Sequence, residues 1–186
     1  MTNKEIILDI SKRNGLTHIG SSLTVLPIIE EIYKEKKPDE KFVLSAGHAH
    51  LAHLVVMNPE TAEDMILKHG IHCTTEAGCD VSTGSLGHGL GIAVGMALAN
   101  RERNVYCLIS DGECAEGSVW EALRVAYEQG TYNLKVYVNI NGWASYQTVD
   151  GELLRKRLDT FFPTQTRFTI QEEPFTGLKG HYAKAT

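Results

Sequence analysis

Two oxygen-bearing side chains, Asp111 and Asn141, each follow a short apolar run and have the chemistry to hold a divalent metal ion. Asp111 lies in the sequence SDGE of residues 110–113, and Asn141 is followed by Gly142. A carboxylate oxygen, an amide oxygen and a main-chain carbonyl suit Mg²⁺, which can then bridge two phosphate groups. Asp-Gly and Asn-Gly pairs are also common in ordinary turns. The prediction therefore depends on the elements that position the two side chains.

The two apolar runs, residues 104–109 (NVYCLI) and 135–140 (KVYVNI), are typical of buried strands. Between them, residues 116–129 carry apolar side chains at helical spacing and end before a glycine, which is a common helix stop. A strand, a helix and a second strand form a βαβ unit with parallel strands. Open α/β sheets bind ligands at the carboxyl ends of their strands, so we expect Asp111 and Asn141 to meet at one sheet edge.

Glycines recur at positions 84, 87, 89, 91 and 95, within the segment 84–99. Glycine lets a backbone approach a ligand closely. The free N–H groups of a helix that begins here could also bind an anion or the polar edge of a ring. Tight packing of a small-residue helix against a sheet accounts for the same spacing, and the residues leave both interpretations open.

The rest of the chain alternates helix and strand patterns, which predicts an α/β fold. The expected helices are residues 3–13, 26–34, 49–57, 59–68 and 152–159, and the expected short strand is residues 41–44. Residues 165–186 show no clear periodicity. We therefore expect one domain over residues 1–186 with a shortened, irregular C-terminal tail over 152–186.

Composition narrows the classes of function. A net charge of −5 over 186 residues gives no basic footprint, which argues against nucleic acid as a partner. No apolar run approaches the ~18 residues that a membrane-spanning helix needs, and the first residues lack the hydrophobic region of a signal peptide. The four cysteines include no CxxC pair and are expected to be reduced, which predicts a cytoplasmic location.

Short motifs, taken in their order along the chain, resemble those of transketolases. They are THIGSS at 17–22, LSAGHA at 44–49, VSTGSLG at 81–87, Asp111-Gly112 with EG at 116–117 and EA at 121–122, and NL at 133–134 with Asn141. More closely, the chain resembles the N-terminal subunit of split transketolases, which carries the thiamine-diphosphate-binding domain alone. The resemblance implies a doubly wound, mostly parallel α/β sheet with helices on both faces.

The resemblance also implies residue roles. Asp111 and Asn141 match the Mg²⁺ ligands, and the carbonyl of Trp143 takes the place of a third protein ligand. His18 and His72 match catalytic histidines that reach the ketose substrate and its reacting oxygens. Four further residues match contacts to thiamine diphosphate along its diphosphate, central region and pyrimidine: His48, Gly112, Gly84 and Leu86. Glu116 and Glu121 match acidic residues near a subunit interface. His50, His53 and His69 match no such position, and we interpret them as structural or surface histidines.

Several positions depart from the family pattern. Ser110 stands where glycine is usual, Asn139 where an acidic residue is common, Ala46 in place of a frequent lysine, and His88 in place of a frequent glutamine. The tail is expected to be shorter than that of the usual subunit. The family has a further cofactor-contacting histidine late in this domain, and His181 is the candidate for it.

The function that the resemblance implies is transfer of a two-carbon ketol unit from a ketose or ketose phosphate to an aldehyde, with thiamine diphosphate and Mg²⁺. No part of the chain resembles the pyrimidine-binding domain that completes such an active site. We therefore expect a separate pyrimidine-binding (C-terminal) subunit as partner, and a homodimer of this chain within a heterotetramer. Two alternatives stay open: a component of a deoxyxylulose-phosphate-synthase-like or 2-oxo-acid-using enzyme, and a non-catalytic scaffolding subunit.

Overall fold

The structure, a computed structural model, describes residues 1–144 and 147–185, with the side chain of each of these except Leu178. In this part of the chain four parallel strands form one sheet in the order β1-β2-β3-β4. Their bounds are β1 Lys41–Leu44, β2 Val105–Ser110, β3 Leu134–Ile140 and β4 Thr164–Phe168. The parallel pairing of β2 with β3 confirms the predicted βαβ unit.

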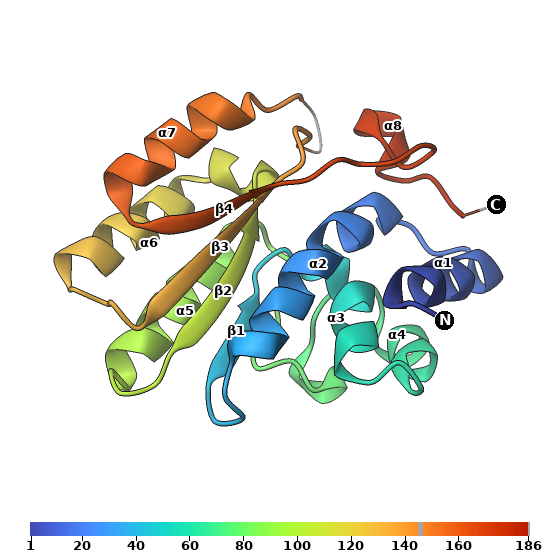
Figure 1. The fold of residues 1–186 in the computed structure, drawn as a ribbon, viewed down its shortest axis with the longest axis horizontal. Coiled ribbons are helices and arrows are strands. Elements are labelled where there is room, and N and C mark those ends of the chain that lie inside the picture. The colour runs from blue at the N-terminus through green and yellow to red at the C-terminus, as the bar shows by residue number, and fades with distance from the viewer. Residues whose placement is uncertain (145–146, 186) are drawn as a thin grey trace.

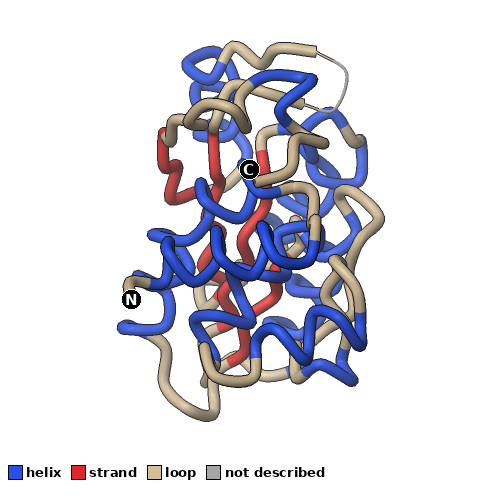
Figure 2. Tube along the Cα trace, turned by 90° about the vertical axis from the view of Figure 1, so that its right-hand side faces the viewer, coloured by secondary structure: helices blue, strands red, loops and turns tan. Residues whose placement is uncertain are grey.

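Helices cover both faces of the sheet (Figures 1 and 2). One layer holds α1 Asn3–Asn14, α2 Ile19–Glu35, α3 His50–Met57 and α4 Ala62–His69, and the other holds α5 His88–Ala99, α6 Gly117–Glu128 and α7 Gly151–Phe161. Successive strand residues face opposite layers: Tyr106 and Leu108 pack with α1–α4, whereas Cys107 and Ile109 pack with α5–α7. This is the expected doubly wound α/β fold, with one apolar core on each face.

Short elements complete the described chain. They are the 3₁₀ turns η1 Gly47–Ala49, η2 Thr75–Ala77 and η3 Gly112–Ala115, and the helix α8 Gly177–Gly180. Two of these turns, η1 and η3, directly follow the carboxyl ends of β1 and β2. They therefore lie at the edge of the sheet where ligands are expected.

Two helices begin several residues away from where the pattern predicts. We expected a helix over 26–34, but α2 already begins at Ile19 and contains Pro27 in its interior. Burial of residues such as Ile19 and Val25 offsets the backbone hydrogen bond that proline cannot make. We expected a second helix to begin at residue 59, but α4 begins at Ala62. The side chain of Asn58 accepts a hydrogen bond from the Glu60 N–H at 3.0 Å and so holds these residues in a turn.

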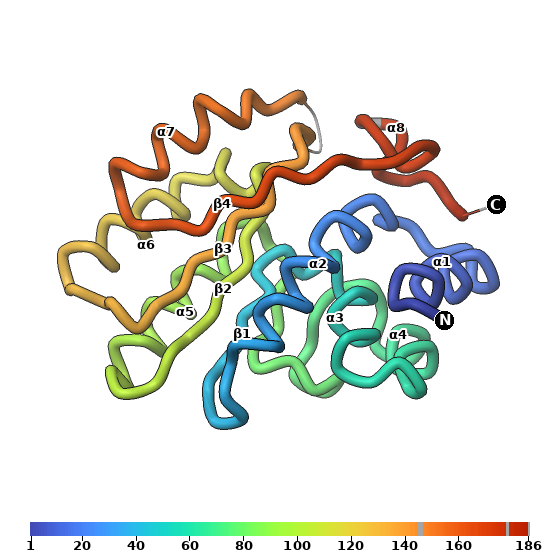
Figure 3. The backbone as a smooth tube through the Cα atoms, in the orientation of Figure 1, coloured from blue at the N-terminus to red at the C-terminus, as the bar shows by residue number. Residues whose placement is uncertain are grey.

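The expectation of an irregular tail was wrong for residues 164–168 and 177–180, which form β4 and α8, whereas residues 169–176 and 181–185 have no helix or strand. Besides α7, the tail supplies β4, which pairs with β3 from Val136 opposite Thr164 to Ile140 opposite Phe168. Beyond β4 the chain crosses from the sheet to α8 and ends beside α1 and α2 (Figure 3). The His18 N–H donates to the carbonyl of His181 at 3.1 Å, so the tail is tied to the start of α2.

No helix among the described residues combines the length and the apolarity that crossing a membrane requires.

Candidate functional site

The carboxyl ends of β2 and β3 bring Asp111 and Asn141 together, as the βαβ pattern predicts. One oxygen of the Asp111 carboxylate accepts hydrogen bonds from the Asn141 N–H at 2.9 Å and the Gly142 N–H at 2.8 Å. The other accepts from the Gly112 N–H at 2.9 Å. The side-chain oxygen of Asn141 in turn accepts from the Trp143 N–H at 3.0 Å. The loop after β3 is thus folded around the Asp111 carboxylate.

Asp111 is almost fully buried, with 2% of its surface exposed. Burial raises the pKa of its carboxyl to about 6, although the hydrogen bonds from Gly142, Gly112 and Asn141 act in the opposite direction. An ionised carboxylate kept from water gains more from a nearby cation than an exposed one does. Asp111 therefore has both the ligand chemistry and the electrostatic need for a divalent cation.

Glu113 joins three of the sequence motifs, and we assigned it no role from the sequence. Its buried carboxylate accepts hydrogen bonds from the Ser45 hydroxyl at 2.6 Å, the Gly87 N–H at 3.0 Å and the Ser110 N–H at 2.9 Å. Burial raises the pKa of Glu113, and these hydrogen bonds oppose the shift. The contacts connect the turn after β1, the glycine segment before α5 and the end of β2. The sequence feature that could have indicated this role is the presence of an ionisable residue inside the SDGE motif.

The structure brings three of the predicted histidines into one cluster. The ring centroid of His18 lies 5.7 Å from that of His48 and 4.4 Å from that of His181, and His48 lies 5.9 Å from His181. His18 has a positive φ of 63°, which is rare for a residue other than glycine. The turn that carries His18 into α2 and the tail that carries His181 thus meet beside the η1 turn that carries His48.

The clustered histidines are neutral at pH 7. Burial lowers the pKa of His48 to about 3 and that of His18 to about 4, and charge repulsion from the other histidines, including His72, adds to both shifts. Burial also lowers the pKa of His181. A neutral imidazole offers one hydrogen-bond donor and one acceptor, so these rings can bind hydroxyl groups.

His72 is exposed, in the loop between α4 and α5. A Cβ atom built on Gly84 would lie 3.1 Å from its ring, so Gly84 leaves room for this histidine. Other glycines of the segment serve packing. Gly87 has a φ of 73°, and a Cβ there would lie 2.6 Å from the Ser118 hydroxyl; one on Gly89 would lie 2.7 Å from the Ser45 hydroxyl. The packing interpretation of the glycine spacing therefore holds for Gly87 and Gly89.

Gly91 and Gly95 do not follow that interpretation. A Cβ on either would meet no described atom within 4 Å, and both lie on the exposed side of α5. Glu116 and Glu121 are likewise exposed, at the start of α6 and inside it. Close packing within the described chain thus explains the first part of the glycine segment and leaves the outer side of α5 without a contact.

The departures from the family pattern are accommodated locally. The Ser110 hydroxyl and N–H both contact the Glu113 carboxylate, at 3.3 Å and 2.9 Å. The amide of Asn139 donates to the Thr24 hydroxyl at 3.0 Å and accepts from the Thr169 hydroxyl at 2.6 Å. Asn139 therefore links α2 to the chain that follows β4, where an acidic side chain would have no hydrogen to donate to Thr24.

Most of the predicted site residues line one pocket at this edge of the sheet. The lining includes Ala46, His48, Leu86, Ser110, Asp111, Gly112, Asn139, Asn141, Trp143 and His181. The free volume is about 30 Å³, and Gln171 and His181 line the pocket from the tail. His72 and Gly84 lie outside the lining, and His18 reaches it through the histidine cluster.

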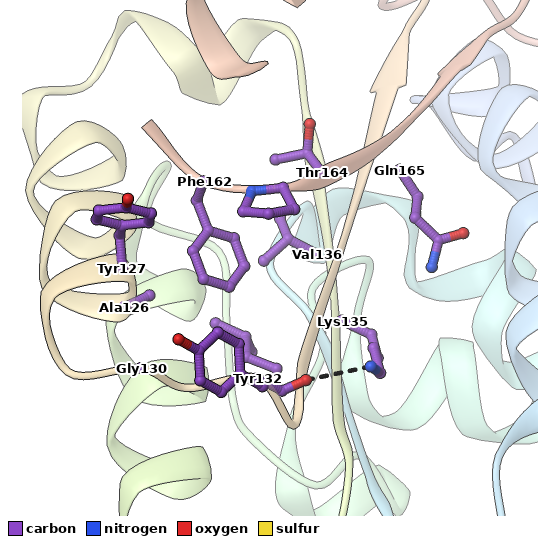
Figure 4. Close-up of a pocket in the computed structure, with 11 residues that line it drawn as sticks. Ala126, Tyr127, Gly130, Tyr132, Lys135, Val136, Phe162, Thr164 and Gln165 are labelled. Atoms are coloured by element: carbon purple, nitrogen blue, oxygen red, sulfur yellow. Dashed lines mark hydrogen bonds between the residues drawn. The ribbon is translucent and has the colours of Figure 1, made fainter. Parts of the chain in front are cut away.

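Another hollow lies at the opposite end of the strands and is mainly apolar (Figure 4). Leu134 and Thr164, the first residues of β3 and β4, line it together with aromatic side chains such as Tyr132 and Phe162. The described residues around it include Lys135, whose amine donates to the Tyr132 carbonyl at 3.1 Å, but no histidine or carboxylate. Because open α/β sheets bind ligands at carboxyl ends, we place the candidate site at Asp111.

The donor set fits a metal-bound diphosphate. A buried carboxylate, an amide oxygen and a nearby carbonyl are oxygen ligands of the kind Mg²⁺ takes. Among the described residues that line the pocket, Asp111 is the one carboxylate. Its neighbour Gly112 and the neutral His48 and His181 add no negative charge. Together with the parallel sheet, these features define an α/β domain of the diphosphate-binding class.

The comparisons with known proteins agree with that class. The model of a family described as 1-deoxy-D-xylulose-5-phosphate synthase matches residues 2–184. One of the subunits of the apulose-4-phosphate transketolase of Phocaeicola vulgatus is 31% identical over 164 residues, which cover 75% of this chain and 58% of that protein. Transketolase-like protein 2 of Bos taurus is 38% identical over 128 residues, or 59% of this chain and 20% of that protein. The chain thus spans between a fifth and three fifths of these relatives.

A solved structure shows the same fold. Transketolase from Campylobacter jejuni superposes with a TM-score of 0.73 at 20% identity, over 96% of this chain and 39% of that one. The chain belongs to the 1-deoxy-D-xylulose-5-phosphate synthase family, and its fold is that of the matching part of transketolase. The comparisons confirm the resemblance to the N-terminal subunit of split transketolases.

Proposed function

We propose that this chain is the diphosphate-binding subunit of a two-component transketolase, a transferase of carbohydrate metabolism located in the cytoplasm. The reaction moves a two-carbon ketol unit from a ketose or ketose phosphate to an aldehyde acceptor, with thiamine diphosphate and Mg²⁺. The observation that supports it most is the meeting of Asp111 and Asn141 at neighbouring strand ends, in one pocket with His48, in a chain of this family.

In this proposal the ends of β2 and β3 hold the metal and the cofactor. Asp111, Asn141 and the Trp143 carbonyl bind Mg²⁺. The cofactor contacts come from His48, Gly84, Leu86, Gly112 and His181. Once bound, thiamine diphosphate supplies the carbon nucleophile for breaking and remaking a C–C bond. A cation beside Asp111 also offsets the burial that raises the pKa of its carboxyl.

His18 and His72 act on the substrate in this proposal. They orient its hydroxyl groups and exchange protons with its reacting oxygens. The lowered pKa keeps the imidazole of His18 neutral at pH 7, so its ring can orient a substrate hydroxyl by donating or accepting a hydrogen bond. The exposure of His72 leaves its ring open to a sugar that enters from solvent.

In this proposal the tail shifts when the cofactor binds. The pocket that Asp111 shares with His48 offers about 30 Å³, which is room for one or two water molecules, and a hollow of about 220 Å³ also reaches Asp111. Gln171 and His181 line the smaller pocket from the tail, so a shift of these residues is the local change that admits the cofactor. His181 would then contact the cofactor from its new position.

The partner in this proposal is a separate pyrimidine-binding subunit, and two copies of each chain form a heterotetramer. The relative from Phocaeicola vulgatus, which is named as one of the subunits of its transketolase, supports a two-component arrangement. The uncovered glycines of α5 and the exposed carboxylates of Glu116 and Glu121 supply a surface for such contacts. Sugars or sugar phosphates are the remaining ligands.

A second candidate is a component of a deoxyxylulose-phosphate-synthase-like enzyme, which uses a 2-oxo acid as donor. The description of the matching family favours it. The two candidates share the metal and cofactor site and differ in the donor. Release of CO₂ distinguishes them, because a 2-oxo acid loses its carboxyl group before its remaining carbons are transferred and a ketose donor does not.

The test is to co-purify the chain with a pyrimidine-domain protein encoded beside it. Mg²⁺-dependent binding of thiamine diphosphate is measured by calorimetry for the complex and for each chain alone. Turnover is then assayed with an aldehyde and either a ketose phosphate or a 2-oxo acid. We expect cofactor binding and ketol transfer only in the complex. CO₂ release from the 2-oxo acid would establish the second candidate, and a complex without cofactor binding would make the chain a scaffolding subunit.

A further inference from the structure

A second group of polar side chains lies outside this pocket, inside the α1–α4 layer. His50 and His53 come from α3, and Cys73 and Cys79 come from the loop between α4 and α5. All four are buried, with between 0% and 6% of their surfaces exposed. A ring nitrogen of His50 and the two sulfur atoms lie within 4.8 Å of one another. Neither the candidate site nor the family resemblance gives these residues a role.

The hydrogen bond of His50 determines which of its ring nitrogens keeps a lone pair. Its Nδ1 lies 3.1 Å from the carbonyl oxygen of Gly70. A carbonyl oxygen only accepts, so Nδ1 carries the hydrogen and Nε2 of the neutral ring has the lone pair. This Nε2 is buried and has no hydrogen-bond partner among the described residues. A buried, unpaired nitrogen of this kind calls for an additional ligand.

His53 has the complementary arrangement. Its Nε2 lies 2.7 Å from the hydroxyl of Tyr33. Its Nδ1 lies 3.7 Å from Sγ of Cys73 and 3.5 Å from Sγ of Cys79. When Nε2 donates to the tyrosine, the Nδ1 lone pair points toward both sulfurs. A metal-binding histidine is commonly oriented in this way, by a hydrogen bond from its other ring nitrogen.

We propose that His50, His53, Cys73 and Cys79 bind one Zn²⁺ ion in a tetrahedral Cys₂His₂ site. His50 and the two sulfurs already form one group, and His53, which contacts both sulfurs but is not part of that group, completes the site when the two rings move closer together. Zinc bonds of about 2.3 Å to sulfur and about 2.0 Å to nitrogen place sulfur and nitrogen ligands roughly 3.5 Å apart. The two distances from His53 have this size. The sulfurs lie 2.9 Å apart and must separate to about 3.8 Å when the ion enters. Thiolate and imidazole ligands select zinc rather than the Mg²⁺ that suits Asp111.

The two histidines favour a metal over a disulfide between the cysteines. A disulfide requires the sulfurs to approach to about 2.05 Å. That bond would satisfy the sulfurs and would leave the lone pairs of His50 and His53 buried without a donor. A zinc ion would satisfy all four side chains once the rings of His50 and His53 close around it. Both cysteines are free thiols in the structure.

The ion would fasten the loop of His72 to the helix that follows His48. Cys73 directly follows His72 in the chain, and its N–H donates to the Gly47 carbonyl at 3.1 Å. Its own carbonyl accepts from the Thr83 N–H at 3.0 Å. Zinc would thus hold this loop from the side chain of Cys73 while the backbone bonds hold it to η1 and to the glycine segment.

The test is the zinc content of the purified full-length chain, measured by mass spectrometry of the metals after growth in zinc-supplemented medium. We expect about one zinc ion per chain, and four thiols that become reactive after denaturation in a chelator. The Cys79→Ala variant should lose the zinc. Cys107→Ala, which also removes a buried thiol but lies in β2, should keep it.

Cobalt substitution gives a second measurement that does not depend on the stability of a variant. Co²⁺ in the wild-type chain should give the absorption of a four-coordinate site with thiolate ligands, and added Zn²⁺ should abolish it. A chain that holds no zinc and no cobalt, with all four thiols free, overturns the proposal. Two missing thiols and a mass lower by two hydrogens would show a disulfide instead, which also overturns it. Neither readout uses thiamine diphosphate or turnover, so failure here leaves the proposed function untouched.

Discussion

Replacing Asp111 with asparagine should remove metal-dependent cofactor binding while the chain stays folded. The amide oxygen of asparagine can keep the hydrogen bonds from the Asn141 and Gly142 N–H groups. Its NH₂ group must then face the Gly112 N–H, which loses its acceptor. Losing a hydrogen bond to a charged group costs about 1.5–3 kcal/mol.

The variant also removes a buried charge. Burial raises the pKa of Asp111 from 3.8 to about 6, and a rise of this size corresponds to roughly 3 kcal/mol against the ionised form. The two effects have opposite signs and similar size. We therefore expect the free energy of unfolding of Asp111→Asn at pH 7 to lie within about 2 kcal/mol of the wild-type value. Alanine would instead leave three buried N–H donors unpaired, at a cost of about 1–3 kcal/mol each.

The difference between wild type and Asp111→Asn should depend on pH in one direction. The folded pKa of Asp111 is raised, so between about 6 and 3.8 the folded chain binds more protons than the unfolded chain. The wild type should therefore gain stability relative to the variant as the pH falls through this range. Urea denaturation of both proteins at a series of pH values, from neutral down to 3.8, measures this difference in stability. The control is Asp159→Asn, which removes an exposed charge.

Calorimetry of the assembled enzyme with thiamine diphosphate, with and without Mg²⁺, measures the functional effect. We expect no Mg²⁺-dependent binding in Asp111→Asn and normal binding in Asp159→Asn. Unchanged cofactor affinity in the first variant refutes the metal role of Asp111. Global unfolding of that variant at pH 7 refutes the balance of energies.

Three further outcomes follow from the site. The contribution of His48 to stability should fall as the pH drops from about 6.5 toward 4, because burial lowers its folded pKa and the unfolded chain takes up protons first. In urea denaturation the pH profile of His48→Gln should therefore be flatter than that of the wild type, and an identical profile would contradict the burial effect. His72→Ala should slow ketol transfer by about 10²–10⁴-fold and leave cofactor affinity unchanged, whereas the control His69→Ala should change neither. Loss of cofactor binding in His72→Ala would assign His72 a different role. Glu113→Gln should destabilise the chain by about 1–3 kcal/mol in urea, because one oxygen that accepts from Ser110 is replaced by a donor; full stability would show that this network contributes little.

Sequence patterns were sufficient for the central βαβ unit, because its strands are buried on both faces. Val136 and Val138 on one face and Tyr137 on the other leave no exposed position in the middle of β3. Such a strand reads as a continuous apolar run. Parallel strands joined by one helix leave little freedom in where their carboxyl ends lie, so Asp111 and Asn141 could be placed together in advance.

The same reasoning failed for the edge of the sheet. β4 has the sequence TQTRF and is only partly buried, so it carries neither an apolar run nor an alternating pattern. What makes it a strand is the exposed edge of β3, which supplies backbone hydrogen-bond partners. The tail beyond β4, and with it the position of His181, could not be derived without that pairing.

The burial of single polar residues could not be predicted from the sequence either. Glutamate and histidine are mostly exposed or only partly buried, so a pattern gives no reason to bury Glu113, His50 or His53. Their burial depends on partners far along the chain: Ser45 for Glu113 and Tyr33 for His53. Two histidines three residues apart on an apolar helix, followed by two cysteines, were the available signal for the proposed zinc site.

The proposed zinc site and the proposed substrate histidine His72 share one loop. Residues 70–83 carry Cys73 and Cys79 on the side that faces α3, and His72 on the exposed side. If zinc holds the buried side, the exposed histidine is positioned by an ion that takes no part in the reaction. The position of His72 then depends on sulfur and nitrogen ligands, whereas cofactor affinity depends on oxygen ligands at Asp111 and Asn141. Removal of zinc should therefore lower turnover more than it lowers the affinity for thiamine diphosphate, whereas removal of Mg²⁺ should lower both, because turnover needs the bound cofactor.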